Sequence, residues 1–439
     1  MAAMDRLSSL PDSIIHHILS FLTVEDSAPT SILSKRFRYQ WTFNPNLCFS
    51  ENFFNLEAMD KCIKQYRGSQ LSKFCIELLS FKAELPKVHQ WLDFVVSRNV
   101  RDLTIRGAWF TVPDALFSLE TLESVTLSNC YLYRPKNIKC CDSLRCLSLY
   151  NVNEYDGAIE EILRKCRKIE SLELNTTSKT ECVNFSVVLP ELRKIYVYLM
   201  CKVFIVRAPK LEELEVDGHI VKMDIENTPR LKYVHFAFQQ GRKVPSMDVV
   251  DLGSYMQYIA NVKALVLTEQ VLKLYTEYCS RGSRVVFQNL KVLHIQDVNG
   301  IDTVYSFVRF FQDCPVLEEL KMHFWKTEMN GYLVDVDIKL MLELDDYFFN
   351  HLKVVNILNF SYSLKNMLLL KLLWKGAPIL EKVNLHLDEM GQDEKELILR
   401  LAKISPDATI KLYDHSQLHM FFEDVGGAPS LYRLPILRF

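Results

Sequence analysis

Three successive stretches of the chain read LESVTL at residues 122–127, LRCLSL at residues 144–149 and IESLEL at residues 169–174. Each has an apolar residue at its first, fourth and sixth position, and the last two alternate with polar residues as in a strand that buries one face. With conservative apolar exchanges, copies start at residues 100, 122, 144, 169, 192, 211, 231, 262, 290, 317, 352 and 380. The recurrence, at spacings of 19 to 35 residues, predicts an array of one repeated unit.

Proline supplies a second, independent signal. It stands two residues before the first apolar position in five copies, at Pro190, Pro209, Pro229, Pro315 and Pro378. Because proline cannot continue a helix and pushes the preceding residue toward extended geometry, it marks the end of the segment that returns to the next strand. The shared register indicates that the repeat is genuine.

Several segments between the copies carry apolar residues at helical spacing, which predicts helices behind the strands. The residues concerned are Ile159, Ile162, Leu163 and Cys166; Val304, Phe307, Val308 and Phe311; and Leu397, Leu401 and Ile404. An earlier strand at residues 74–78 is predicted to add a divergent first unit. Since one strand and one return cannot bury their apolar faces alone, successive units should stack into one continuous core.

A period of about 20–29 residues is typical of the leucine-rich repeat. The predicted fold class is therefore α/β, a leucine-rich-repeat solenoid (horseshoe) preceded by a small three-helix module. A doubly wound α/β enzyme would also alternate strands and helices. That fold uses a glycine-rich phosphate turn, and neither G-x-G-x-x-G nor G-x-x-x-x-G-K-[ST] occurs in the sequence.

The composition excludes several other classes of protein. The 439 residues carry a formal net charge of −2, so there is no basic excess that would predict nucleic acid as a partner. The apolar stretches at 14–24 and 367–374 are interrupted by histidine or lysine and are too short to span a membrane, so no membrane contact is expected. Twelve cysteines without a C-x-x-C pair indicate thiols of a reducing compartment, the cytoplasm and/or the nucleus.

Residues 5–49 lack the repeat and show helical periodicity instead. Pro11 and Asp12 suit a first helical turn, and Thr23 followed by Asp26 predicts the start of a second helix. Behind Pro11 lies one apolar stripe, made of Ile14, Ile15, Ile18, Leu19 and Leu22. So small a module cannot bury all its apolar side chains internally, so either another protein or the first repeat should cover the surplus.

The string L-P-D-x-I-I-x-x-I-L-S-F-L at residues 10–22, followed by T-S-I-L-S-K-R-F-R-x-x-W at residues 30–41, resembles the F-box, especially the plant versions joined to leucine-rich repeats. The resemblance implies that the module docks on the Skp adaptor of a cullin–RING ubiquitin ligase. By position, the adaptor-contact or module-core residues would be Leu10, Pro11, Ile14, Ile15, Ile18, Leu19 and Leu33. This assignment requires free surface, and would fail if Ile14, Ile18 and Leu19 were sealed against the repeats.

The resemblance continues downstream, because residues 351–388 look like the FBD-type region of those plant proteins. The expected domains are the F-box at 1–50, the solenoid at 51–345, FBD-like terminal repeats at 346–420 and a C-terminal tail at 421–439. Pro29 departs from the family pattern. Inside a helix, proline removes a backbone donor and costs about 3 kcal/mol, so we expect it to kink the second helix and weaken adaptor docking.

The sequence shows no constellation that points to catalysis. His415 and His419 lie four residues apart, but no H-E-x-x-H motif or third metal ligand accompanies them, and no G-x-S-x-G elbow occurs. We therefore expect no enzyme activity, no catalytic residue, no cofactor and no metal.

The expected function is the substrate-recognition subunit of an SCF-type ligase, with a Skp-type adaptor, and through it cullin, on the F-box and an unknown protein substrate on the concave face of the solenoid. One alternative is a non-ligase recognition scaffold with a degenerate F-box, which Pro29 motivates. Another is a small-molecule receptor. It is disfavoured because no basic cluster for a phosphate cofactor stands out in the sequence.

Overall fold

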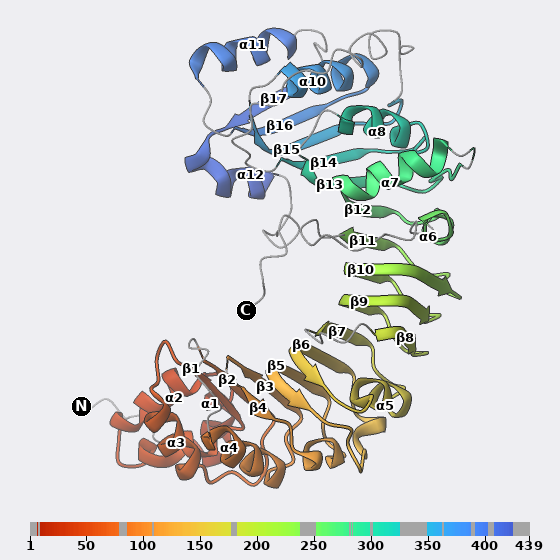
Figure 1. Ribbon diagram of the computed structural model, residues 1–439. Helices are drawn as coiled ribbons and strands as arrows, with labels where there is room; N and C mark the ends of the chain where they lie inside the picture. Colours follow the sequence, from red (N-terminus) through yellow and green to blue (C-terminus); the bar gives the residue numbers. More distant parts are fainter. Residues whose placement is uncertain are drawn as a thin grey trace, which may run out of the picture. The chain divides into compact units, whose positions relative to one another are not determined.

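The computed structural model describes residues 7, 9–78, 86–107, 109–176, 182–237, 252–280, 282, 284–298, 302–324, 349–361, 364–387, 391–402 and 408–424. Residues 1–201 with 205–211 form one unit, called unit 1, and residues 202–204 with 212–439 form another, called unit 2. Each is built on parallel strands (Figure 1). Among the residues just named, no helix is long and apolar enough to cross a membrane.

Unit 1 begins with short helices. They are α1 (Asp12–Leu19), α2 (Val24–Ser27), η1 (Ala28–Ile32) and η2 (Phe37–Phe43), where η denotes a 3-10 helix. The Thr23 side chain accepts a hydrogen bond from the N–H of Asp26 and caps α2, as the sequence predicts. The predicted three-helix module is thus modified, because only α1 is a full α-helix and the rest is one α-helical turn followed by 3-10 helices.

Pro29 accounts for this change of helix type. It occupies the first turn of η1, immediately after α2 ends at Ser27. A proline in a first turn lacks an N–H that would have no intrahelical partner there in any case. The second α-helix therefore ends before Pro29 and continues as a 3-10 helix, where the sequence predicted a kink inside one helix.

The strands of unit 1 pair in parallel wherever they join its principal ladder. They are β1 (Asn46–Ser50), β2 (Lys73–Glu77), β3 (Asp102–Arg106), β4 (Phe110–Thr111), β5 (Ser124–Leu132), β6 (Cys146–Glu154), β7 (Ser171–Thr176), β8 (Cys182–Val188) and β9 (Lys194–Arg207). The principal ladder follows the order β1, β2, β3, β5, β6, β7 and β9. The returning segments contain α3 (Leu56–Gln65), α4 (Pro86–Ser97), η3 (Asp114–Ser118), η4 (Cys140–Asp142) and α5 (Ala158–Lys165).

Unit 2 repeats the arrangement, and each of its strands pairs in parallel with the next. The strands are β10 (Glu213–Glu226), β11 (Tyr233–Ala237), β12 (Ala264–Thr268), β13 (Val292–Val298), β14 (Glu319–Phe324), β15 (Val354–Phe360), β16 (Lys382–Leu387) and β17 (Thr409–Tyr413). The helices are α6 (Leu252–Tyr258), α7 (Glu269–Ser280), α8 (Asp302–Phe311), α10 (Leu364–Gly376), α11 (Gln392–Ala402), η5 (His415–Gln417) and α12 (Leu418–Asp424).

All twelve copies of the sequence pattern form strands, and each strand begins at the third residue of its copy, from Asp102 to Lys382. The register aligns equivalent apolar positions: Leu103 lies opposite Val125, which lies opposite Leu147. All three are buried, so within unit 1 successive copies share a continuous core, as predicted.

Helix burial confirms the described residues of two predicted stripes and contradicts the third at Leu397; the side chains of Val304, Val308 and Leu401, and all of Ile404, lie outside the described residues. Ile159 and Ile162 on α5 and Phe307 on α8 are buried. On α11, however, Leu397 is 40% exposed while Ile398 is fully buried. The run Leu-Ile-Leu at 397–399 puts an apolar residue on several faces of the helix, and the periodicity placed Leu397 instead of Ile398 on the buried one.

The ends of the repeat array differ from the expected boundaries. Strand β1 already pairs with β2, so the sheet starts before residue 50. At the other end, α12 runs through the expected boundary at residue 420, and Phe421 is fully buried against Leu358 and Tyr413. The first part of the expected tail is thus packed against unit 2.

Candidate functional site

Helix α1 divides its apolar residues between two faces. Ile15 and Leu19 are buried and form a small core with Phe37 of η2. Leu10 and Leu22 pack partly against this core. Ile15 and Leu19, which the sequence prediction included in the adaptor-binding set, therefore hold the module together. Because their side chains are inaccessible, they offer no contact surface.

The other predicted contact residues remain accessible. Ile14 and Ile18 are each 44% exposed on the outer face of α1, Leu33 is 61% exposed, and Pro11 is exposed beside them in sequence. The structure adds further large apolar side chains that the predicted set omitted, namely Leu7, Phe21 and Ile32. Ile32, the last residue of η1, is 85% exposed. Its signal in the sequence was the apolar pair Ile32-Leu33 directly before a polar turn.

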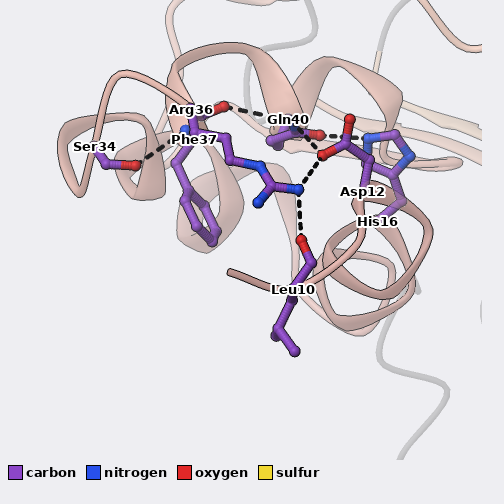
Figure 2. A network of polar contacts seen from close by, with 7 residues as sticks. All are labelled: Leu10, Asp12, His16, Ser34, Arg36, Phe37 and Gln40. Carbon is purple, nitrogen blue, oxygen red and sulfur yellow. Dashed lines mark hydrogen bonds and ion pairs between the residues drawn. The ribbon is translucent and has the colours of Figure 1, made fainter. Parts of the chain in front are cut away.

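A polar network fixes the start of α1 against η2 (Figure 2). The Arg36 guanidinium donates to the Leu10 carbonyl at 2.5 Å and pairs with the Asp12 carboxylate at 2.7 Å. Gln40 lies 2.6 Å from the ring of His16 and donates to Asp12 at 3.4 Å. The hydrogen bond from Arg36 holds the pKa of the Asp12 carboxyl below its usual value. These contacts orient the Leu10-Pro11 segment and the exposed face of α1.

Asn44 fixes the other end of α1. It is fully buried, and its side-chain amide donates to the carbonyls of Leu19 at 2.9 Å and Leu22 at 3.0 Å. Asn46 donates in the same way to the Ser20 carbonyl at 2.8 Å. The last carbonyls of a helix lack backbone N–H donors within the helix, and these two side-chain amides supply donors in their place. Sequence reasoning missed both, although Asn44 and Asn46 bracket a proline just before the first strand.

The sheet face opposite the apolar core was the predicted surface for a target protein, and the two units present it differently. In unit 1, Thr104, Thr126 and Ser148 lie in register on this face and are partly exposed. In unit 2, Asn356 and Asn384 are buried, with the amide of Asn384 donating to Asn356 at 2.6 Å. Helix α12 covers the same face at β15 to β17, so part of it is already occupied.

Comparison with known proteins agrees with the division of the chain into an N-terminal helical module and a repeat array. Residues 7–48 match the F-box domain, and residues 62–414 match the leucine-rich-repeat domain described for At1g61320/AtMIF1. The chain belongs to the F-box/leucine-rich-repeat family. The F-box match contains all seven predicted adaptor-binding residues, and the repeat match contains every strand from β2 to β17.

Relatives of this F-box/leucine-rich-repeat protein occur in Arabidopsis thaliana. The F-box/LRR-repeat protein At3g26922 is 30% identical over 52% of this chain and 80% of its own length. The F-box/FBD/LRR-repeat protein At1g13570 is 24% identical over 92% of this chain and 98% of its own length. F-box/LRR-repeat protein 25 is 33% identical over 42% of this chain and 72% of its own length. The FBD-like region expected from the sequence thus has a counterpart among these relatives.

Proposed function

We propose that this F-box/leucine-rich-repeat protein is the substrate-recognition subunit of an SCF-type cullin–RING ubiquitin ligase. The F-box docks a Skp-type adaptor, and through it cullin, while the repeats hold the target protein. The observation that carries the proposal is the division of α1. Ile14 and Ile18 are 44% exposed on the helix whose other face, with Ile15 and Leu19, is sealed in the module's core.

The exposed apolar side chains supply enough binding energy for a stable complex. Phe21, Ile32 and Leu33 are 77%, 85% and 61% exposed, in addition to the two isoleucines of α1. Complete burial of one such side chain contributes about 1.5–3 kcal/mol. A group of this size on a small module is typical of an interaction site.

The scaffold alternative rested on damage to the F-box by Pro29. Pro29 stands in the first turn of η1, and the chain beyond it still places Phe37 against Ile15 and Leu19 in the core of the module. The geometry therefore favours a competent F-box, and adaptor binding is the measurement that separates the two functions.

In this role the chain carries out no chemical step and acts by bringing the target protein close to the ubiquitin-conjugating enzyme. A target held on the repeats is brought to a conjugating enzyme carried elsewhere in the complex, and the gain is in effective concentration. The proposal includes no catalytic residue in this chain. The proposal also places the protein in the cytoplasm and/or the nucleus, as expected from its twelve cysteines without a C-x-x-C pair.

The direct test measures binding of the purified full-length protein to a purified Skp adaptor by biolayer interferometry. Ile18→Glu places a carboxylate in the proposed interface and should weaken binding at least about thirtyfold, since burying an unpaired charge costs several kcal/mol. Ile379→Glu is the matched control, because Ile379 is 43% exposed in unit 2. It should bind like the wild type. A wild-type protein that does not bind any Skp adaptor would leave only the recognition scaffold.

The target can be sought by affinity purification with the proteasome blocked, comparing the wild type with Leu10→Ala/Pro11→Ala. Proteins enriched by both forms are candidate targets of the repeats. The adaptor and cullin should be absent from the double variant, because it alters the segment that Arg36 orients beside α1.

A further inference from the structure

The second residue of the repeat is charged in every one of the twelve copies. In chain order the residues are Arg101, Glu123, Arg145, Glu170, Arg193, Glu212, Lys232, Lys263, Lys291, Glu318, Lys353 and Glu381. Within each unit, the backbone N–H at this position donates to the carbonyl of the equivalent residue one copy earlier, as from Lys263 to Lys232 and from Lys291 to Lys263. The charged side chains therefore stand next to one another along the edge where the strands begin.

Opposite charges alternate along most of this row, and several neighbours form ion pairs. In unit 1, Arg145 and Arg193 flank Glu170 at 3.7 and 3.8 Å. In unit 2, the backbone places Lys353 between Glu318 and Glu381. Such alternation stabilises neighbouring strands, because opposite charges face each other across each pairing.

In unit 2 the alternation is interrupted by three lysines that are neighbours in the row, Lys232, Lys263 and Lys291. The outer two pair with acids that flank the triplet: Lys232 lies 2.8 Å from Glu212, and Lys291 lies 2.6 Å from Glu318. Lys263 is exposed and has a lysine on each side of it in the row. Strands lie about 4.8 Å apart, so the triplet concentrates positive charge on a short edge of a protein with no overall positive charge.

Apolar side chains lie directly beside the three lysines. Each lysine is followed by the first residue of its strand, and these residues are Tyr233, Ala264 and Val292. They lie opposite one another in the register of β11, β12 and β13, and all three are partly exposed. The edge thus combines cations with an adjacent strip of apolar surface.

We propose that Lys232, Lys263 and Lys291, with the strip Tyr233, Ala264 and Val292, form a docking surface for an acidic segment of the target protein. The inference rests on the proposed receptor function and specifies the target's chemistry. An acidic polypeptide can place a carboxylate at Lys263 and apolar side chains on the strip. A long phosphate backbone fits less well, because Glu212 and Glu318 close the cationic edge on both sides.

The test uses the full-length protein and a dye-labelled peptide of about ten residues, with glutamate at alternate positions and leucine or serine between them. Fluorescence anisotropy should show binding that weakens as salt is raised. Lys263→Glu should reduce the affinity at least about tenfold, because a like charge is then placed against the peptide. This variant should remain folded, since it restores alternation along the row. Lys61→Glu makes the same charge change at an exposed position on α3 and should bind like the wild type.

Two results would overturn the docking surface. One is equal affinity of the wild type and Lys263→Glu for the peptide. The other is tighter binding of a single-stranded oligonucleotide than of the peptide. The ligase proposal can be tested separately, because Ile18→Glu should abolish binding of the adaptor and leave binding of the peptide unchanged. A wild-type protein that binds the peptide but no adaptor would leave the docking surface intact and remove the ligase role.

Discussion

At the scale of single residues, Asn44 joins the exposed face of the F-box to the rest of unit 1. Its amide satisfies the carbonyls of Leu19 and Leu22 in a fully buried position, directly before β1. Asn44→Ala leaves both carbonyls without this donor, which should destabilise the module by about 2–3 kcal/mol. We expect faster hydrogen exchange in α1 and weaker adaptor binding.

Asn52→Ala provides the matched control, because Asn52 is exposed in the turn after β1. Its hydrogen exchange in α1 should equal that of the wild type. Slow exchange of α1 in Asn44→Ala would show that the two carbonyls find other partners, and that Asn44 is dispensable for the site.

A second residue-scale prediction concerns pH. Burial lowers the pKa of His323 to about 4, and the Asn359 amide lies 3.2 Å from its Nε2, which must be unprotonated to accept from it. An unfolded histidine titrates near pH 6.5, so the unfolded chain takes up a proton as pH falls from 6.5 toward 4 while folded His323 does not. Unit 2 should therefore lose up to about 3 kcal/mol over this interval.

Urea unfolding at pH 7 and at pH 4.5 checks this prediction. His323→Gln keeps an acceptor for Asn359 without a titratable ring, so its stability should fall less with acidification than that of the wild type. His351→Gln changes an exposed histidine and should retain the wild-type dependence. Equal acid sensitivity of His323→Gln and the wild type would contradict the assignment.

The sequence correctly predicted which helix carries the contact residues, but it did not separate the exposed face of that helix from its buried face. Ile14, Ile15, Ile18 and Leu19 all fit one broad apolar stripe. Which pair turns inward depends on where Phe37 of η2 packs, and that contact joins segments far apart in the sequence. For the same reason the role of Asn44 could not be predicted, since its partners lie on α1 and in the turn after it.

At the scale of the elements, the strands were predictable because each copy of the pattern encodes its own strand. What the pattern did not reveal is a backbone irregularity two residues after its last apolar position, which in most copies lies within the strand. The residues there have positive φ and are Gly107, Asn129, Asn151, Gly218, Asp297 and Asn359. Glycine, asparagine and aspartate tolerate this geometry best, so an alignment of the copies by these residues would have found it.

The charged row gives an element-scale prediction about stability. Lys263→Glu places an acid between Lys232 and Lys291 and completes the alternation, so the Tm of unit 2 should rise by about 1 °C. Lys353→Glu does the reverse, because it puts a third acid between Glu318 and Glu381, and the Tm should fall by a similar amount. Both shifts should shrink in high salt. Thermal melts at two salt concentrations decide the matter, and shifts of the same sign in both variants would refute the row as an electrostatic unit.

At the scale of the whole molecule, stability is distributed over many contacts between neighbouring repeats. A local change should therefore be felt in its own unit. This explains why the fold was easier to predict than the site: one pattern repeated twelve times reports the fold, whereas the F-box surface depends on a few contacts made once. It also predicts that adaptor binding and the packing of α12 are separable.

Phe421 tests this separability. It is fully buried against Leu358 and Tyr413 on the face that α12 covers, and Phe→Ala at such a position costs about 3–5 kcal/mol. We expect α12 to detach in Phe421→Ala, so that hydrogen exchange and protease cleavage increase in β17 and α12. Met420→Ala alters a 45% exposed side chain on the same helix and should change neither. Affinity for the Skp adaptor should equal that of the wild type in both variants, because its proposed contacts lie in unit 1. A loss of adaptor affinity in Phe421→Ala alone would mean that the repeats transmit a disturbance over their whole length.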